Sequence, residues 1–208
     1  MTRGRFVTLE GGEGAGKSTQ ARLLAEALRA RGIAVLVTRE PGGTAGAEAI
    51  RELLLRPRAT GWGAPAEALL FAAARADHVA RAIRPALEAG TWVLCDRFVD
   101  SSRAYQGGAG ALGDDDVMTL HRIGSGALLP DLTVLLAVSP AEASARLAQR
   151  DGGAADAIGG RGDAYHGAVA AAFAAMAAAE PDRFAVVDAD GDAQAVHARV
   201  LSAVERLR

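Results

Sequence analysis

The sequence has little or none of several features that mark particular classes of protein. Its 208 residues include one cysteine, Cys95, which excludes an internal disulfide and fits a reducing compartment. No apolar run is long enough to indicate a signal peptide or a membrane-spanning helix. The formal net charge of −2 lacks the basic excess of general nucleic-acid binders. We therefore expect a cytoplasmic protein that binds neither membrane nor nucleic acid.

Lysine is nearly absent as well. Lys17 is the only lysine among the 23 basic residues, and all the others are arginine. Arginine can replace lysine on a solvated surface, but not where a compact point charge must fit among backbone amides. The single lysine therefore indicates that position 17 needs such a charge. No cluster of histidine and cysteine suggests a bound transition metal.

Short apolar runs alternate with helical patterns along the chain. Half of the residues are hydrophobic, so we expect residues 1–208 to form one domain. We expect strands at 6–9, 33–37, 91–95, 132–138 and 184–187. We expect helices at 17–31, 45–55, 64–89, 114–127, 168–180 and 193–207. Another helix should start after an N-cap at Ser139, with Glu142 closing a capping box. We expect a loop or broken helix at 101–110 and a loop at 151–162. The continuous apolar run at 33–37 is typical of a strand buried on both faces. The alternation predicts an α/β fold with a parallel sheet.

Residues 11–18 read Gly-x4-Gly-Lys-Ser, the full pattern of a phosphate-binding P-loop. The pattern follows an expected strand and opens an expected helix, which is the context that the chemistry requires. Glycines let backbone N–H groups approach the phosphates, and the helix adds the positive end of its dipole. Lys17 reaches the β- and γ-phosphates of ATP, and the hydroxyl of Ser18 ligates Mg²⁺. The candidate ATP-binding residues are Gly11, Gly12, Glu13, Gly14, Ala15, Gly16, Lys17, Ser18 and Thr19.

A P-loop by itself is shared by GTPases, motor ATPases and small-molecule kinases. The guanine-binding motif Asn-Lys-x-Asp cannot be present, because the chain has no second lysine. A motor ATPase would be longer and would close a strand with Asp-Glu, whereas the strand at 91–95 is followed by Asp96 and Arg97. The pattern therefore favours a kinase that acts on a small molecule.

Four segments together resemble the bacterial thymidylate kinase family in their order and spacing. They are 10–19 around the P-loop, 38–44 (TREPGGT), Phe71 with Arg75, and 96–107 (DRFVDSSRAYQG). The resemblance implies a P-loop kinase fold, with a five-stranded parallel sheet flanked by helices and a mobile lid at about 146–165. It also implies a homodimer that transfers the γ-phosphoryl group of Mg·ATP to thymidine monophosphate (dTMP), giving ADP and dTDP for dTTP biosynthesis.

The resemblance implies that five residues contact the sugar and phosphate of dTMP. Glu13 would hold the 3′-hydroxyl, and Tyr105 would crowd the 2′ position and favour deoxyribose. Arg39 and Arg51 would lie beside the acceptor phosphate. Arg97 would bridge the donor and acceptor phosphates as a catalytic residue, which suits the planar fork of arginine.

The resemblance also implies a base site and a metal ligand. Phe71 would stack on the thymine ring, Arg75 would bond its O4, and Ser102 and Gln106 would read its polar edge. Asp96 would lie near Mg²⁺ and its waters as a catalytic residue. Taken one by one, these residues have simpler interpretations. Phe71 could be a core residue, Arg75 could be a solvated charge on a helix, and Asp96 could belong to a structural ion pair. Only their shared spacing favours the site.

The lid agrees less well with the family. The P-loop contains no arginine, and in such members the lid supplies that charge; Arg150 matches the catalytic lid arginine, and Arg146 would lie near adenine. Further on, the chain has 156–159 (DAIG) and Ala170 where charged residues are common. Arg161 could compensate, and losing lid charge would lower turnover more than it would affect substrate binding.

Two rival functions stay open at this point. One is a kinase for another nucleoside monophosphate or a deoxynucleoside, against which the candidate thymine contacts argue. The other is a nucleotide-binding protein with impaired catalysis, to which the altered lid would belong. A complete P-loop with Arg97 and Arg150 argues against the second, and ATP binding without turnover would support it.

Overall fold

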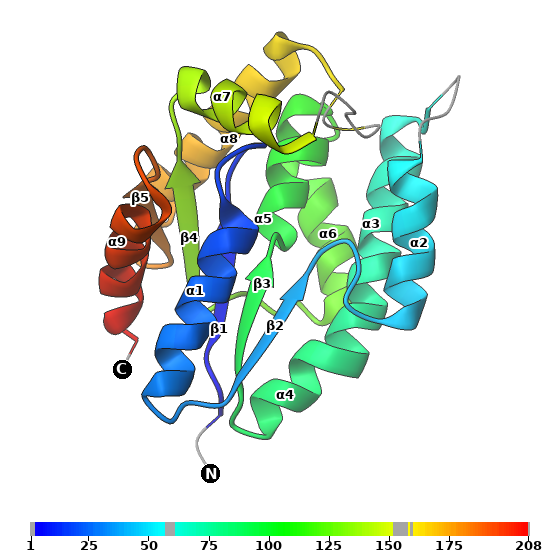
Figure 1. Cartoon of the computed structure of the whole chain (residues 1–208). Coiled ribbons are helices and arrows are strands. Elements are labelled where there is room, and N and C mark those ends of the chain that lie inside the picture. The colour runs from blue at the N-terminus through cyan, green and yellow to red at the C-terminus, as the bar shows by residue number, and fades with distance from the viewer. Residues whose placement is uncertain (1–2, 57–60, 152–157, 159, 208) are drawn as a thin grey trace.

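A computed structural model of the chain describes residues 3–56, 61–151, 158 and 160–207. Five strands form one sheet in the order β2-β3-β1-β4-β5, and every neighbouring pair is parallel. The strands are β1 (Phe6–Glu10), β2 (Val35–Arg39), β3 (Trp92–Asp96), β4 (Leu132–Ala137) and β5 (Phe184–Asp188). Helices cover both faces of this sheet (Figure 1). The predicted α/β fold with a five-stranded parallel sheet is confirmed.

The helices follow the expected order along the chain. They are α1 (Lys17–Ala30), α2 (Ala45–Leu55), α3 (Ala64–His78), α4 (Arg84–Glu88), α5 (Val99–Ser102), α6 (Asp114–Ser125), α7 (Pro140–Asp151), α8 (Asp163–Ala179) and α9 (Ala193–Glu205). Within the described part of the chain, no helix is long and apolar enough to cross a membrane.

The predicted helix at 64–89 is continuous but changes its winding before the proline. A π-helical segment, Val79–Ile83, joins α3 to α4. Pro85 offers no N–H, and its ring collides with the carbonyl four residues earlier in a regular α-helix, so a wider turn at this place relieves both problems. A second π-helical segment, Arg103–Ala109, continues α5 where a loop or broken helix was expected.

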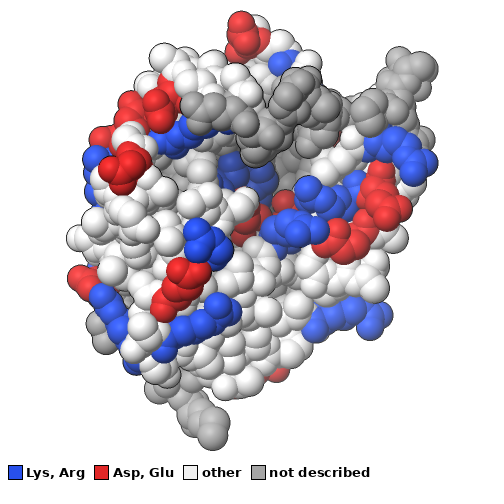
Figure 2. Space-filling model, viewed as in Figure 1, with Lys and Arg blue, Asp and Glu red and all other residues white. Residues whose placement is uncertain are grey.

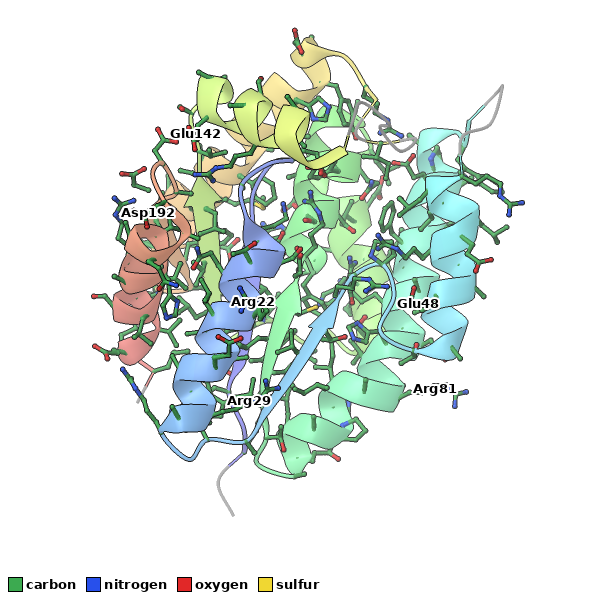
Figure 3. The ribbon with its side chains drawn as sticks, viewed as in Figure 1. Arg22, Arg29, Glu48, Arg81, Glu142 and Asp192 are labelled. Atoms are coloured by element: carbon green, nitrogen blue, oxygen red, sulfur yellow. The ribbon has the colours of Figure 1, made fainter. Side chains whose placement is uncertain are left out.

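The core lies on both faces of the sheet. On one face α1 and α9 pack against β1 and β4, and Leu24 and Leu28 of α1 are fully buried there. Arg22 and Arg29 lie on the outer side of α1, as its alternation of apolar and charged residues predicts (Figure 3). On the other face Phe6 meets Phe98 edge to face, with 4.8 Å between the ring centroids. The two layers fix the sheet that positions the site.

Two details of the sequence-based expectations are wrong. The segment at 33–37 was expected to be a strand buried on both faces, but β2 begins at Val35 and forms an edge of the sheet. Within the described residues β2 pairs with β3 alone, and Val37 is 40% exposed. Hydrophobicity alone cannot distinguish an edge strand from a central one. Helix α8 also begins five residues earlier than expected, at Asp163.

The start of α7 follows the predicted capping in part. The backbone N–H of Glu142 donates to the Ser139 hydroxyl at 3.3 Å, so Ser139 is an N-cap. The Glu142 carboxylate accepts from Arg146 at 2.9 Å rather than returning to the cap. Most of the predicted loop at 151–162 lies outside the described residues.

Candidate active site

The P-loop lies between β1 and α1, the strand–loop–helix context that the sequence predicts. Three of its glycines have backbone angles that side chains rarely adopt, with φ 137° at Gly11, 74° at Gly14 and 85° at Gly16. A Cβ atom at Gly11 would lie 2.6 Å from the Leu136 carbonyl oxygen, and one at Gly14 would lie 2.7 Å from that of Ala143. The loop is therefore packed so closely against β4 and α7 that only glycine fits at these two positions.

Lys17 is buried against the backbone of this loop. Its Nζ donates to the carbonyl oxygens of Gly11 at 3.1 Å and Gly12 at 2.7 Å. Burial is the main cause that lowers the pKa of Lys17 to about 8, and the positive charge of Arg97 contributes in the same direction. The only lysine of the chain thus lies where a compact cation fits among backbone groups, as its rarity predicted.

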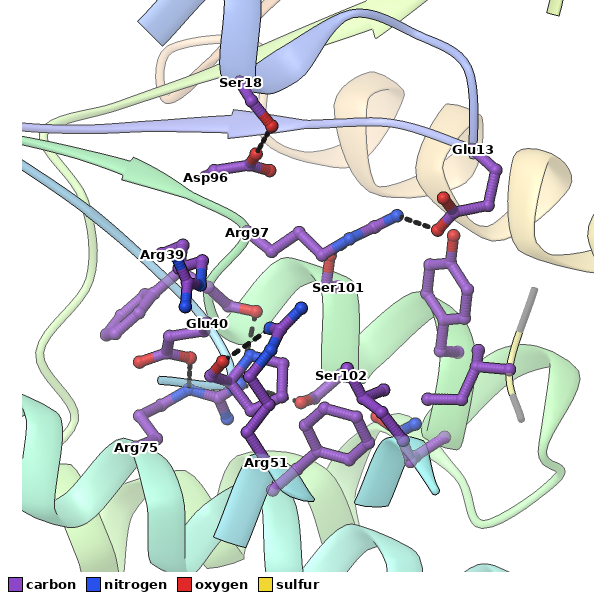
Figure 4. A pocket seen from close by; sticks show the side chains of 17 residues that line it. Glu13, Ser18, Arg39, Glu40, Arg51, Arg75, Asp96, Arg97, Ser101 and Ser102 are labelled. Atoms are coloured by element: carbon purple, nitrogen blue, oxygen red, sulfur yellow. Dashed lines mark hydrogen bonds and ion pairs between the residues drawn. The ribbon is translucent and has the colours of Figure 1, made fainter. Parts of the chain in front are cut away.

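The two residues predicted to bind Mg²⁺, Ser18 of α1 and Asp96 of β3, lie side by side. The Ser18 hydroxyl donates to Oδ2 of Asp96 at 2.5 Å (Figure 4). A hydroxyl beside a carboxylate is the oxygen donor set that Mg²⁺ prefers, and waters and phosphate oxygens complete its octahedron. The residues present therefore fit the predicted magnesium site.

Arg97 is held in an unusual backbone conformation directly after β3. Its φ of 67° lies in the left-handed region, which is costly for a non-glycine residue. The guanidinium donates to the Gly11 carbonyl at 3.0 Å, to the Ser101 hydroxyl at 3.2 Å and to Glu13 at 2.6 Å. It also lies over the Tyr105 ring, 5.0 Å from the centroid. The alternative of an Asp96–Arg97 ion pair is not what the structure shows, since Arg97 pairs with Glu13.

A cavity of about 220 Å³ opens beside Arg97 and collects the predicted acceptor residues (Figure 4). Its lining includes all nine of them: Glu13, Arg39, Arg51, Phe71, Arg75, Arg97, Ser102, Tyr105 and Gln106. Ser18 and Asp96 lie at the same cavity. Residues from five separate segments of the chain therefore converge, because the carboxyl ends of parallel strands meet at one edge of the sheet.

One end of the cavity is lined by buried polar side chains from α3 and α5. Arg75, only 3% exposed, donates from Nε to Glu40 at 2.8 Å, and from Nη2 to the Ser102 hydroxyl at 2.8 Å and the Phe98 carbonyl at 3.2 Å. The other Glu40 oxygen lies 3.1 Å from Nδ1 of buried His78. Arg75 is thus not a solvated charge on a helix but a buried one, held in place by hydrogen bonds.

The other end of the cavity is basic. Arg39 contacts Glu48 at 3.0 Å, and Arg51 donates to the Pro41 carbonyl at 2.7 Å. A backbone hydrogen bond from Gly43 holds the pKa of Glu48 below its usual value, and Arg39 acts in the same direction. Figure 2 shows basic side chains gathered where this face of the molecule is hollowed. Such an end suits a phosphate group.

Only some of the residues predicted for the lid lie among those that the structure describes. Arg146 donates to the carbonyls of Ala189 at 2.8 Å and Gly191 at 2.9 Å, and approaches that of Gly14 at 3.5 Å. The Arg150 side chain, and positions 156, 157 and 159, lie outside the described residues. Arg161 does not lie at the phosphate end, because it pairs with Glu67 of α3.

Comparison with known proteins agrees with this geometry. The family model described as thymidylate kinase matches residues 9–200. A thymidylate kinase of Rhizorhabdus wittichii is 58% identical over 204 residues, which cover 98% of each chain. The thymidylate kinase of Caulobacter vibrioides is 48% identical and covers 98% of this chain and 97% of its own.

The chain belongs to the thymidylate kinase family. A crystal structure of thymidylate kinase from Ehrlichia chaffeensis superposes with a TM-score of 0.78 at 31% identity, covering 98% of this chain and 99% of its own. The family, the P-loop kinase fold and the activity of an ATP-dependent nucleoside monophosphate kinase are as the sequence predicted. The rival of a binding protein without an enzymatic function is not supported by relatives so similar over their full length.

Sequence reasoning missed several residues that this member of the family uses to build the cavity. Those lining it are Glu40, Pro41, Leu55, Phe98, Ser101 and Ile158, with His78 and Glu67 directly behind. Glu40 directly follows β2. Binding residues gather at the carboxyl ends of parallel strands, so this position could have indicated Glu40 as a site residue. Glu67 lies four and eight residues before Phe71 and Arg75, which places all three on one side of α3. His78 carried no sequence signal.

Proposed function

We propose that the chain transfers the γ-phosphoryl group of Mg·ATP to the 5′-phosphate of dTMP. An oxygen of the acceptor phosphate attacks the γ-phosphorus in line, the bond to the β,γ-bridging oxygen breaks, and ADP and dTDP leave. The observation that carries the proposal is one cavity that adjoins the P-loop. Basic side chains line one end of this cavity, and the Phe71 ring and the buried hydrogen-bond donor Arg75 line the other. Such a reaction needs two anions brought together and their charge neutralised, with little covalent work by the protein.

The base end suits thymine. Phe71 offers a ring face, and Ser102 and Gln106 are buried polar side chains at the cavity. Nε and Nη2 of Arg75 are engaged, and no described residue accepts from its Nη1. We infer that Nη1 donates to O4 of thymine, an acceptor that cytosine lacks. A donor aimed at this position would meet the amino group of cytosine and repel it.

The sugar and phosphate contacts follow the basic end of the cavity. Arg39 and Arg51 would bind the acceptor phosphate, and Arg97 would reach both phosphates from its place beside the P-loop. The carboxylate of Glu13 would accept from the 3′-hydroxyl. Tyr105, 5% exposed beneath Arg97, would leave no room for a 2′-hydroxyl.

The donor side would use the P-loop from Gly11 to Thr19, with Lys17 leaving its loop carbonyls for the β- and γ-phosphates. Ser18 and Asp96 would hold Mg²⁺, which supplies positive charge to the transferring phosphoryl group when it is bound. Arg146 would border the adenine, and Arg150 would add the lid charge to the transition state.

The proposal extends to the whole molecule. We propose that residues 1–208 act as one cytoplasmic kinase domain with a lid at about 146–165, and that two copies form a homodimer. Leu53 of α2, Leu69 of α3 and Ile123 of α6 support the dimer, because they are 43%, 56% and 77% exposed on helices that pack together. Sedimentation of the wild type against Ile123→Asp tests it: a monomeric wild type would refute the dimer.

The test of the reaction is an acceptor panel. Purified protein is mixed with Mg·ATP and dTMP, dUMP, dCMP or dGMP, and ADP is measured together with the nucleoside diphosphate. We expect dTDP and ADP in equal amounts, with the other acceptors far behind. ATP binding without any phosphorylated acceptor would refute the proposal, and a better acceptor than dTMP would refute the base contacts alone.

A further inference from the structure

A chain of polar contacts links the segment before α8 to the base end of the cavity. Arg161 pairs through Nη2 with Oε2 of Glu67, and its Nη1 donates to the Tyr165 hydroxyl at 2.5 Å. The Tyr165 hydroxyl in turn donates to the Tyr105 carbonyl at 2.9 Å. The other Glu67 oxygen accepts from Nε2 of Gln106 at 2.9 Å. Positions far apart in the sequence thus meet behind the base end.

This arrangement decides which way the Gln106 amide points. A carboxylate can only accept hydrogen bonds, so Glu67 must face the NH₂ group of Gln106 and not its oxygen. The oxygen Oε1 is then turned away from Glu67. Gln106 lines the cavity, and no described residue donates to Oε1. The amide therefore offers an acceptor to whatever occupies the base end.

We propose that Glu67 is a positioning residue for base selection, which fixes Gln106 so that its oxygen accepts from N3–H of thymine. This inference rests on the proposed function. Thymine presents a donor at N3 and an acceptor at O4, whereas cytosine presents the opposite at both places. Gln106 as acceptor and Arg75 as donor then match thymine twice and oppose cytosine twice.

Arg161 has a defined part in this arrangement. Glu67 is 5% exposed, and a charge at such a buried place needs a partner. The Arg161 guanidinium pairs with it while lying 4.7 Å from the centroid of the Tyr165 ring. Arg161 therefore supports the carboxylate that holds Gln106. The sequence left the position of Arg161 open, and in this arrangement Arg161 supports the base end of the cavity rather than the phosphates.

The first variant is Glu67→Gln in the full-length protein, with kcat and KM measured for dTMP, dUMP and dCMP. The new amide at position 67 can donate or accept, so the orientation of Gln106 is no longer fixed. We expect the ratio of kcat/KM for dTMP over dCMP to fall about tenfold, mainly through the KM of dTMP. The ratio for dUMP over dCMP should fall equally, because neither of these bases carries the 5-methyl group.

A matched control and a reciprocal exchange separate positioning from mere support of the fold. Glu88→Gln, on an exposed position of α4, should leave both ratios unchanged. In the double variant Glu67→Gln with Gln106→Glu, the carboxylate at position 106 accepts from the new amide and again turns an oxygen toward the base. We expect the ratio of kcat/KM for dTMP over dCMP to be at least threefold higher in this double variant than in Glu67→Gln. A purely structural role predicts a further loss instead.

Arg161→Met removes the partner of Glu67 and should lower the same ratio about threefold while changing kcat less than twofold. It also keeps the inference testable if Glu67→Gln does not fold. Unchanged ratios in Glu67→Gln, or in Arg161→Met where the first variant is unfolded, would overturn the inference. No dTDP from the wild type would instead refute the proposed function, so the two failures are distinguishable.

Discussion

The two halves of the active site are built in different ways. The proposed acceptor half is held by side chains that pair with each other, as Arg75 does with Glu40 and Gln106 with Glu67. The phosphate-binding part of the donor half is built from backbone groups of the P-loop and one lysine, which donates to carbonyls of its own loop. In the proposed reaction the first half would keep these contacts when dTMP binds, whereas the second would exchange its internal contacts for phosphate oxygens.

This difference follows from what each half must recognise. A base is distinguished by donors and acceptors at fixed positions, so the side chains that read it need partners that hold them still. A triphosphate is distinguished by charge and shape, which a glycine loop and a helix N-terminus supply from the backbone. Changes in the donor half should therefore affect turnover and ATP binding, and changes in the acceptor half should affect stability and the KM for dTMP.

The largest effect is expected at Lys17. Arginine at position 17 keeps the charge, but its planar fork does not fit between the Gly11 and Gly12 carbonyls, so Lys17→Arg should lower kcat about a thousandfold. Steady-state kinetics with ATP and dTMP measure it. Arg22→Lys, an exchange on the exposed side of α1, should stay within twofold of the wild type. A mild effect of Lys17→Arg would mean that charge alone suffices.

The next effect tests the acceptor half. Glu40→Gln leaves the guanidinium of Arg75 without its buried partner and should lower the free energy of unfolding by about 3 kcal/mol. Chemical denaturation measures it, and the KM for dTMP should rise in parallel. The exposed pair of Arg39 with Glu48 is the control, since Glu48→Gln should cost less than about 1 kcal/mol in stability. Equal losses in both variants would contradict the view that the buried pair of Arg75 with Glu40 stabilises the acceptor half more than the exposed pair of Arg39 with Glu48.

A third test uses the lowered pKa of Lys17, which is about 8 in the free protein. Below that pH Lys17 is already charged when ATP binds, whereas above it binding requires the uptake of a proton. ATP affinity should therefore fall by up to about tenfold per pH unit above pH 8. Calorimetry in buffers of different ionisation enthalpy measures the proton uptake. Lys17→Met should show none, and equal uptake in both proteins would assign it to another group.

The smallest effect is expected at Arg146, which ties α7 to carbonyls of the segment after β5 and to the P-loop. Arg146→Ala should raise the KM for ATP about fourfold, in keeping with lost hydrogen bonds of about 1 kcal/mol. Arg199 binds the carbonyls of Asp188 and Asp190 nearby without contacting the P-loop, so Arg199→Ala should leave this KM unchanged. An equal rise in both variants would contradict the role of the P-loop contact.

Much of the fold and most of the candidate site were predictable from the sequence. The P-loop lies in one short segment, and the α2 boundaries at Ala45 and Leu55 agree with those expected. Nine candidate acceptor residues do line one cavity. What could not be predicted concerns pairs that are distant in sequence, such as Glu67 with Arg161, because no local pattern relates two residues on different elements.

The sequence by itself determined the α/β class, the phosphate loop and the residues that gather around a substrate. Periodicity and motifs within one element carry that information. Only the tertiary structure decided that β2 is an edge strand, that Arg97 adopts a left-handed backbone, and that Arg161 pairs with Glu67. Each of these depends on which elements become neighbours, and that choice is made by packing over the whole chain.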